Sequence, residues 1–245
     1  MKVIVTGASR GIGRAIAVET AKRHAGSTIG IGYHASRADA EETARLVEEA
    51  GAKAIFCGAD IADAAAVERA FIAFAGEAGG LDAVVVNAAT HLAGLLATAD
   101  TAALERLVRV NTLGPIVCAR AALEPMLKEK RGLFLFLGSI ATTRPTRGQA
   151  AYAATKASVE ALTRAIAVEY GRKGIRAICL RPGAVMTDML EATMAMAGEE
   201  VTSRIPVRRV ADPVEVGRFA AILLGDDAAY ASGAIIDFDG GYAAS

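Results

Sequence analysis

The stretch that decides the fold is VIVTGASRGIGRAIA, which spans residues 3–17. Val3–Val5 is an apolar run of strand type, and Arg14–Ala25 has the pattern of a helix. The turn between them carries glycines at positions 7, 11 and 13. Glycine lets the backbone approach a phosphate, and the free N–H groups and dipole of a helix N-terminus stabilise its charge. The stretch therefore predicts a strand, a turn and a helix with an anion site at the turn.

The glycine spacing is GxxxGxG, whereas the usual dinucleotide fingerprint is GxGxxG. Three interpretations are open: a dinucleotide site, a nucleoside site of methyltransferase type, or a turn that only lets helix and strand pack. Its place after the first strand of a strand–helix series favours the dinucleotide.

Apolar runs of strand length alternate with amphipathic segments of helix length along the chain. The runs are almost wholly apolar, which is typical of strands covered on both faces in a parallel sheet. We expect an α/β protein, a single-domain Rossmann fold over residues 1–245, with a doubly wound seven-stranded parallel sheet and helices on both faces. The predicted strands are Val3–Val5, Thr28–Ile31, Ala54–Phe56, Ala83–Val86, Leu133–Leu137, Ala177–Leu180 and Ala234–Phe238.

The clearest amphipathic segments are Arg37–Ala50, Asp63–Ala78 and Ala151–Arg172. Asp212-Pro213-Val214-Glu215 has the sequence of an N-cap, a proline at the first helical position and a capping-box glutamate, so it should begin the last helix. Residues 184–203 contain four methionines and little strand signal. Flexible thioethers suit an adaptable apolar surface, so this segment is either a surface helix pair or a substrate lid.

Composition excludes several classes of function. Lys+Arg and Asp+Glu are both 27, and no basic stripe favours nucleic acid or an anionic membrane. No apolar run reaches the ~18 residues of a membrane span, and the N-terminus runs straight into a strand. The three cysteines form no CxxC pair, which indicates reduced thiols in a cytoplasmic protein. The spacing of His24, His34 and His91 gives no metal site.

The end of the second strand bears on the cofactor. NAD enzymes usually place an acidic residue there to bind the ribose 2′-hydroxyl. This chain has Tyr33, His34, Ser36 and Arg37, with no acid before Asp39. Arg37 and Arg10 can pair with a 2′-phosphate, and Ser36 and His34 can add hydrogen bonds, although both arginines could equally be solvated. The pattern favours NADP(H).

Tyr152 and Lys156 lie four residues apart on a predicted helix, so their side chains share a face. An ammonium group beside a phenol stabilises the phenolate and suits the pair to proton transfer near neutral pH. Such pairs also occur on exposed helices without any function.

Two further polar residues are candidates for the same site. Ser139 follows the strand Leu133–Leu137, so it should emerge where ligands bind in such sheets, or serve as a turn serine. Asn111 lies in the helical stretch Thr101–Ala122 among apolar neighbours, where an unpartnered polar group is costly. It is either a core asparagine that bonds backbone groups or a residue that holds a proton-relay water.

The order TGASRGIG, Asn87-Ala88-Ala89, Asn111, Ser139, YAATK and Pro182-Gly183 resembles the short-chain dehydrogenase/reductase family over the whole chain. The resemblance implies that Tyr152 is the acid/base, that Ser139 orients the carbonyl, that Lys156 also binds the nicotinamide ribose, and that Asn111 anchors a relay water. The cofactor residues that it implies, together with those of the turn and second strand, are Gly7, Ser9, Arg10, Gly11, Ile12, Gly13, Tyr33, His34, Ser36, Arg37, Asp60, Ile61, Asn87, Ala88, Ala89, Tyr152, Lys156, Pro182, Gly183, Val185 and Thr187. Expected substrate contacts are Ser139, Ile140, Gln149, Tyr152, Ala184 and Met189.

Within the family the chain looks most like the beta-ketoacyl-(acyl-carrier-protein) reductases of fatty acid biosynthesis, at its beginning and at Ile205–Val216 and Asp239-Gly240-Gly241. It departs from them at Ala89, where the NNAG motif ends in glycine, and at Ile178 and Arg181. None of these positions is catalytic, but Arg181 and Thr90-His91 could reshape the substrate pocket.

The resemblance favours reduction of a carrier-linked 3-oxoacyl thioester. The alternatives are reduction or oxidation of a free small alcohol, sugar or ketone, and a non-enzymatic dinucleotide sensor. A sensor has no need of the catalytic residues. An acyl carrier protein could bind a basic surface of Lys128, Lys130, Arg131, Arg172 and Lys173, which could equally be solvated helix ends. The resemblance also implies a homotetramer. Apolar positions that permit one, or that face the sheet, are Leu104, Leu107, Leu123, Val159, Leu162 and Ile166.

Overall fold

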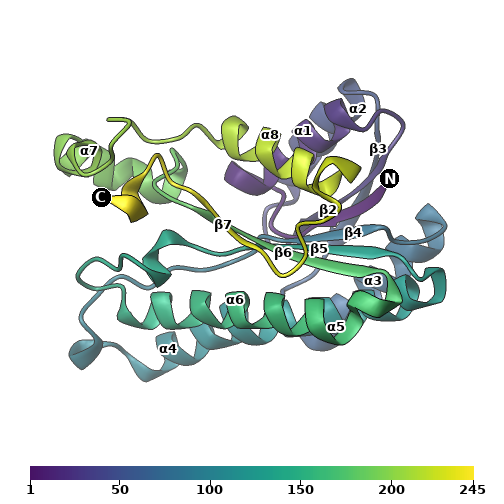
Figure 1. The fold of residues 1–245 in the computed structure, drawn as a ribbon, viewed down its shortest axis with the longest axis horizontal. Helices are drawn as coiled ribbons and strands as arrows, with labels where there is room; N and C mark the ends of the chain where they lie inside the picture. The colour runs from purple at the N-terminus through teal and green to yellow at the C-terminus, as the bar shows by residue number, and fades with distance from the viewer.

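The computed structural model describes the backbone of all 245 residues and the side chains of all except Met189, Ala192, Thr193, Met196 and Ala197. Its seven strands form one parallel sheet in the order β3-β2-β1-β4-β5-β6-β7, which confirms the predicted Rossmann fold (Figure 1). The strands are β1 (Lys2–Val5), β2 (Thr28–Tyr33), β3 (Lys53–Gly58), β4 (Ala83–Val86), β5 (Gly132–Leu137), β6 (Ile175–Pro182) and β7 (Ile235–Phe238).

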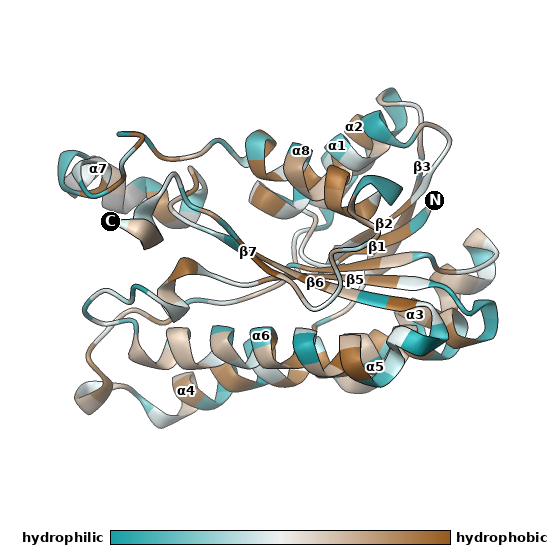
Figure 2. Ribbon diagram, in the orientation of Figure 1, coloured by the Kyte–Doolittle hydropathy of each residue, from teal (hydrophilic) through white to brown (hydrophobic). Residues whose placement is uncertain are grey.

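Helices cover both faces of this sheet (Figure 1). Side chains alternate between the faces along each strand, so Val3 and Val5 pack on one face and Ile4 on the other. Because both faces are covered, most strand residues are apolar, and brown predominates in the central strands of Figure 2. The α-helices are α1 (Gly11–Arg23), α2 (Arg37–Glu49), α3 (Ala64–Ala78), α4 (Thr101–Val108), α5 (Gly114–Glu129), α6 (Ala150–Tyr170), α7 (Asp188–Ser203) and α8 (Pro213–Leu224).

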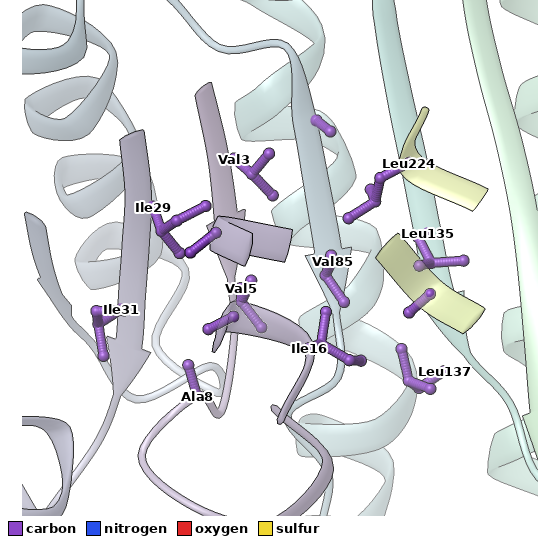
Figure 3. Packing of buried hydrophobic residues seen from close by; sticks show 14 of the residues in the cluster. Val3, Val5, Ala8, Ile16, Ile29, Ile31, Val85, Leu135, Leu137 and Leu224 are labelled. Carbon is purple, nitrogen blue, oxygen red and sulfur yellow. The ribbon is translucent and has the colours of Figure 1, made fainter. Parts of the chain in front are cut away.

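The first core lies between the sheet and the helices α1, α2 and α8. Ile16 of α1 and Leu224 of α8 pack against Val85, Leu135 and other strand side chains (Figure 3). The second core lies under α3, α5 and α6, and it contains the three cysteines. Burial raises the pKa of each thiol to about 12, so these side chains are unreactive packing groups, as the sequence indicates.

Helix ends follow the predicted chemistry. Asp212 and Glu215 form the capping box at the start of α8, with Pro213 in the first turn. Asp63 caps α3 by accepting a hydrogen bond from the N–H of Ala66, and Gly79 ends this helix in the left-handed region.

The helical stretch around Asn111 is interrupted. A π-helical turn, Arg109–Leu113, separates α4 from α5. Such turns are rare and frequently occur at functional sites. The stretch predicted as one helix is therefore two helices joined by a wider turn, and Asn111 is buried in that turn.

The strand order reverses between β1 and β4, so the connections that follow these two strands run to opposite faces of the sheet and leave a crevice between them. The glycine turn after β1 opens into this crevice. Among the described residues, no helix has the length and apolarity needed to cross a bilayer. No cluster of three or more potential metal ligands occurs in the part of the chain with described side chains.

Candidate active site

A cleft of about 1210 Å³ runs along the carboxyl edge of the sheet. Loops after six strands line it, from the end of β3 across β2, β1, β4 and β5 to β6. The segment 184–205 closes one side, with Val185, Asp188 and Leu190 among its lining residues. The cleft thus lies where the reversal of the strand order predicts a ligand.

The glycine turn is shaped to admit another group's atoms. Gly7 has a φ of +63°, and a Cβ there would lie 2.9 Å from Cα of Ala88. A Cβ at Gly13 would lie 2.1 Å from the carbonyl oxygen of Gly7, so only glycine fits. No side chain caps the N-terminus of α1, and its first turn carries no acid. The backbone N–H groups of this turn are therefore left for an anion, which fits a dinucleotide pyrophosphate.

Asn87 fixes the turn from the neighbouring strand. Its Nδ2 donates to the carbonyl oxygens of Thr6 and Gly7 at 3.0 and 3.1 Å. The hydroxyl of Thr6 accepts from the backbone N–H groups of Asn87 and Ala88. Sequence reasoning placed Asn87 in the cofactor site but overlooked Thr6, whose role depends on residues about 80 positions away.

A second brace, also overlooked, ties the turn to α2. Arg14 donates to the carbonyl oxygen of Ser9 and to the hydroxyl of Thr43, which is fully buried. Thr43 donates to the carbonyl oxygen of Ala8 at 3.0 Å. The spacing of Thr43 with Ala40, Ala44 and Val47 marks it as a polar residue on a buried face, and that signal could have found it.

The end of β2 brings together most of the predicted 2′-phosphate ligands. Arg10, His34 and Ser36 line the cleft. Arg37 is not among its lining residues. Its guanidinium lies 3.6 Å from the centroid of the Phe56 ring and donates to the hydroxyl of Tyr33, which does line the cleft.

Charges nearby are mostly paired. Arg10 pairs with Asp188 at 3.0 Å, and this contact joins the glycine turn to the first residue of α7. Asp39 lines the cleft, but it accepts a hydrogen bond from Ser36 and lies 3.9 Å from Arg14. Asp60 lines the cleft beside Ile61 and receives two hydrogen bonds from Arg106. Burial opposes ionisation of Asp60, but hydrogen bonds from Arg106 and Ala62 outweigh it and lower its pKa.

Ser139, Tyr152 and Lys156 line the middle of the cleft. Lys156 is buried, and its Nζ donates to the carbonyl oxygen of Leu137, the last residue of β5, at 2.8 Å. The same Nζ lies 6.0 Å from the centroid of the Tyr152 ring. Oγ of Ser139 accepts from the N–H of Ala141 at 3.2 Å, which leaves the hydroxyl proton for another acceptor. The phenol of Tyr152, the ammonium group of Lys156 and the hydroxyl of Ser139 therefore lie in the same cleft.

His91 packs against the Tyr152 ring with centroids 4.9 Å apart and planes at 64°. It lines the cleft, as does Thr90. Burial lowers the pKa of His91 below its ordinary value, so its imidazole is neutral near pH 7. The imidazole of His91 thus packs against the phenol ring of Tyr152 without placing a charge beside it.

Asn111 is a brace. Its Oδ1 accepts from the N–H of Thr90, and its Nδ2 donates to the carbonyl oxygen of Thr90, both at 2.8 Å. Nδ2 also donates to the hydroxyl of Thr155, which donates to the carbonyl oxygen of Tyr152. Asn111 is 1% exposed and is not among the lining residues of the cleft. The side chain of Asn111 thus bonds backbone groups, as a core asparagine does, and its role in holding a relay water stays a prediction.

Arg181 is held in an ion-pair network. It pairs with Asp237 of β7 at 2.5 Å and with the buried Glu160 of α6 at 3.3 Å, and it donates to the hydroxyl of Thr142. This departure from the family pattern ties β6, β7 and α6 together behind the cleft. Arg181 itself is absent from the lining residues of the cleft, so the idea that it reshapes the pocket stays a prediction.

Apart from Arg37 and Asn111, the structure places every predicted site residue with a described side chain in the cleft. The side chain of Met189 lies outside the described residues. The residues found in the cleft are Gly7, Ser9, Arg10, Gly11, Ile12, Gly13, Tyr33, His34, Ser36, Asp60, Ile61, Asn87, Ala88, Ala89, Ser139, Ile140, Gln149, Tyr152, Lys156, Pro182, Gly183, Ala184, Val185 and Thr187.

Known proteins share this fold and these motifs. A family model described as enoyl-(acyl carrier protein) reductase matches residues 7–243. The 3-oxoacyl-(acyl-carrier-protein) reductase of Staphylococcus aureus is 31% identical over 238 residues, covering 97% of this chain and 96% of that one. The cis-4-hydroxycyclohexanecarboxylate dehydrogenase of Sinomonas cyclohexanicum is 34% identical, with 98% and 96% covered.

Among solved structures, a short-chain dehydrogenase/reductase from Serratia marcescens superposes with a TM-score of 0.91 at 32% identity, with 99% and 97% of the two chains covered. The chain belongs to the short-chain dehydrogenase/reductase family. It is an oxidoreductase that acts on carbonyl and alcohol groups with a nicotinamide dinucleotide.

Proposed function

We propose that this protein uses NADP(H) to interconvert a carbonyl compound and its alcohol, with Tyr152 as the acid/base. The observation that carries the proposal is the convergence of Ser139, Tyr152 and Lys156 in one cleft with the glycine turn. When bound, the dinucleotide supplies or accepts the hydride at the substrate carbon.

The chain's own residues handle the oxygen. Ser139 donates its hydroxyl proton to the carbonyl oxygen and fixes its position. As negative charge develops on that oxygen, Tyr152 transfers its phenolic proton to it. Lys156 is tethered to Leu137 inside the cleft, where its ammonium group stabilises the phenolate that remains. In the oxidative direction the same groups remove the proton.

The preference for NADP(H) rests on charge at the end of β2. Arg10, His34 and Ser36 line the cleft there, and Arg37 lies next to them against Phe56 and Tyr33. Two acids, Asp60 and Asp39, line this end of the cleft. Asp60 receives hydrogen bonds from Arg106, and Asp39 accepts one from Ser36 and lies 3.9 Å from Arg14. A 2′-phosphate would therefore meet cations without an unopposed carboxylate.

Two substrate classes follow from the relatives. The first is a 3-oxoacyl thioester, because a carrier-protein reductase is among the relatives that match nearly the whole chain. The second is a free small alcohol or ketone, since another relative is named for a hydroxy-acid substrate.

The position of the basic residues favours the second class. Lys130 and Lys173 flank the starts of β5 and β6, where Gly132 bonds to Gly174. The starts of these strands lie at the opposite end of the sheet from the cleft, about 20 Å away along the six-residue strand β5. Lys128 and Arg131 are also paired, with Glu124 and Asp82. A carrier protein bound there would not lie at the mouth of the cleft.

The test is NADPH consumption against a panel of ketoacyl thioesters, sugars, diketones and quinones. We expect at least one class to be reduced, and NADPH to bind at least ~10-fold more tightly than NADH, because charge-assisted hydrogen bonds contribute about 1.5–3 kcal/mol each. Tighter binding of NADH would contradict the cofactor assignment, and no turnover across the panel would contradict the reaction.

We also propose that the protein is a homotetramer. The structure leaves three large apolar side chains on the outer face of α4, the π turn and α5: Val108, Leu113 and Ile116 are 50%, 44% and 45% exposed. Three of the positions named from the sequence, Leu107, Val159 and Ile166, instead face the core and cannot contribute.

A further inference from the structure

A side pocket of about 640 Å³ opens beside the catalytic cleft. It shares Arg144, Thr146, Arg147, Arg204 and Tyr242 with the cleft, so the two spaces are continuous. Its remaining lining residues are Pro145, Ser203 and Ser245. Three of the eight are arginines, and one of them, Arg204, pairs with Glu200. Arg144 and Arg147 therefore supply the positive charge of the pocket.

The charges of this pocket differ from those of the rest of the cleft. The cleft arginines Arg10, Arg106 and Arg204 are each paired with a carboxylate, from Asp188, Asp60 and Glu200 respectively. Among the described side chains, none of the ion pairs involves Arg144 or Arg147. Neither guanidinium group of Arg144 and Arg147 therefore pairs with an Asp or Glu side chain that the structure describes, although Arg144 also lies 3.5 Å from Oγ of Ser245.

The loop that carries these arginines is ordered by the protein itself. Gln149 accepts a hydrogen bond from the N–H of Thr146, and the carbonyl oxygen of Gly148 accepts from the N–H of Gly94. Arg144 donates to the carbonyl oxygen of Tyr242 and lies 5.8 Å from the centroid of its ring. The pocket brings Tyr242 and Ser245 together with Ser203 and Arg204 at the end of α7, and in Figure 1 the C-terminus lies beside α7. The guanidinium of Arg144 is thus positioned before any ligand arrives.

The loop also ties the pocket to the chemistry. Arg144 and Arg147 lie between Ser139 and Tyr152 in the chain, so each is five residues from one catalytic residue. A span of five residues reaches at most about 17 Å. One substrate molecule can therefore have its carbonyl at Tyr152 and a distant group in the side pocket.

We propose that Arg144 and Arg147 bind an oxyanion of the substrate, remote from the reacting carbonyl. This inference rests on the proposed function and specifies its substrate class. Guanidinium groups pair with carboxylate and phosphate in the same planar geometry. The oxyanion is thus either the carboxylate of a free oxo- or hydroxy-acid or the phosphate of a pantetheine arm.

The first experiment measures binding of inorganic phosphate to the NADPH-loaded protein by calorimetry. The dinucleotide occupies the glycine turn, so the remaining phosphate site is the side pocket. We expect one site in the wild type, weakened about 10-fold in Arg144→Gln and in Arg147→Gln, because charged hydrogen bonds are lost. Arg172→Gln, which changes an exposed arginine beyond the far end of the 21-residue helix α6, is the matched control and should bind like wild type. Absence of binding, or equal binding in all variants, would overturn the proposal.

The second experiment distinguishes the sources of the oxyanion. Levulinate is compared with its neutral methyl ester, and acetoacetyl-coenzyme A with acetoacetyl-N-acetylcysteamine, which lacks the phosphate. The site is supported if the wild type reduces the charged member of a pair faster and Arg147→Gln removes that difference. A difference in the first pair indicates a free acid, and a difference in the second indicates a pantetheine arm. A charged member that is no better than its neutral partner in both pairs overturns it. A protein that binds phosphate but reduces none of the four compounds contradicts the proposed reaction and retains the anion site.

Discussion

At the scale of single residues, Tyr152 bears the heaviest chemical role in the proposed reaction. Tyr152→Phe keeps the aromatic ring and its contact with His91 but deletes the phenolic proton of this side chain. We expect turnover to fall by 10²–10⁴-fold or more, the usual contribution of general acid catalysis. NADPH binding, measured by fluorescence titration, should remain close to wild type. Reduction at a near wild-type rate by the purified variant would exclude this mechanism.

Lys156 is the comparison for that variant. Its Nζ is bonded to the end of β5 inside the cleft, and we propose that it also holds the nicotinamide ribose. Lys156→Ala should therefore weaken NADPH binding as well as turnover. If Tyr152→Phe and Lys156→Ala lost NADPH binding equally, a structural role for the pair would explain the data better.

His91 should give the protein a measurable pH dependence. Burial lowers the pKa of its imidazole below the ordinary 6.5, so below that pH the unfolded chain binds a proton more readily than the folded one. The contribution of His91 to stability is therefore intact above about pH 6.5 and is lost as the pH falls toward its folded pKa. His91→Phe should lose less unfolding free energy than wild type between neutral and acidic pH in urea titrations. Parallel losses in the two proteins would show that His91 is not the group responsible.

At the scale of elements, the π turn joins three parts of the site. Asn111 projects from it to both backbone groups of Thr90 and to Thr155 of α6. Asn111→Ala would leave buried polar groups without partners, at a cost of about 1–3 kcal/mol each. We expect a matching fall in unfolding free energy by guanidinium titration. Thr112→Ala, in the same turn, removes only a bond to Ser158 and should cost much less; an equal cost would argue against the brace.

The junction of β2 and α2 decides the dinucleotide in our proposal. Arg37→Asp places a carboxylate where the cation lies beside Tyr33. NADPH should then bind more weakly and NADH relatively better, reversing the preference, because a carboxylate repels a 2′-phosphate and can bond a ribose hydroxyl. Arg45→Asp makes the same charge change on the same helix, outside the cleft. Titration of both cofactors should leave its preference as in wild type, and an equal shift in the two variants would point to a general field effect.

At the scale of the whole molecule, the proposed tetramer should use the outer face of α4 and α5. Val108→Lys combined with Ile116→Lys puts two charges into that apolar face and should lower the mass measured by light scattering. Ile72→Lys on α3, where the side chain is 68% exposed, should leave the mass unchanged. A monomeric wild type at micromolar concentration would end the proposal.

The sequence by itself determined the order of elements and most of the site. Apolar runs such as Leu133–Leu137 predicted strands that are buried on both faces of the sheet. The glycines at 7, 11 and 13 predicted a turn in which backbone atoms approach closely. Both signals are local, because periodicity and glycine spacing express what neighbouring residues need. Tyr152 and Lys156 could be paired because residues four apart share a helix face, and Ser139 could be placed at the carboxyl edge of the sheet. The resemblance to the family joined the three in one site.

Tertiary structure decided what each polar group contacts. Asn111 meets Thr90 across 21 residues and Thr155 across 44, Thr6 meets Asn87 across 81, and Arg144 reaches Tyr242 across 98. No local pattern encodes these pairs, since they depend on where loops from different strands come to lie. For the same reason, only the folded chain shows that Arg144 and Arg147 share a pocket and pair with no described Asp or Glu side chain.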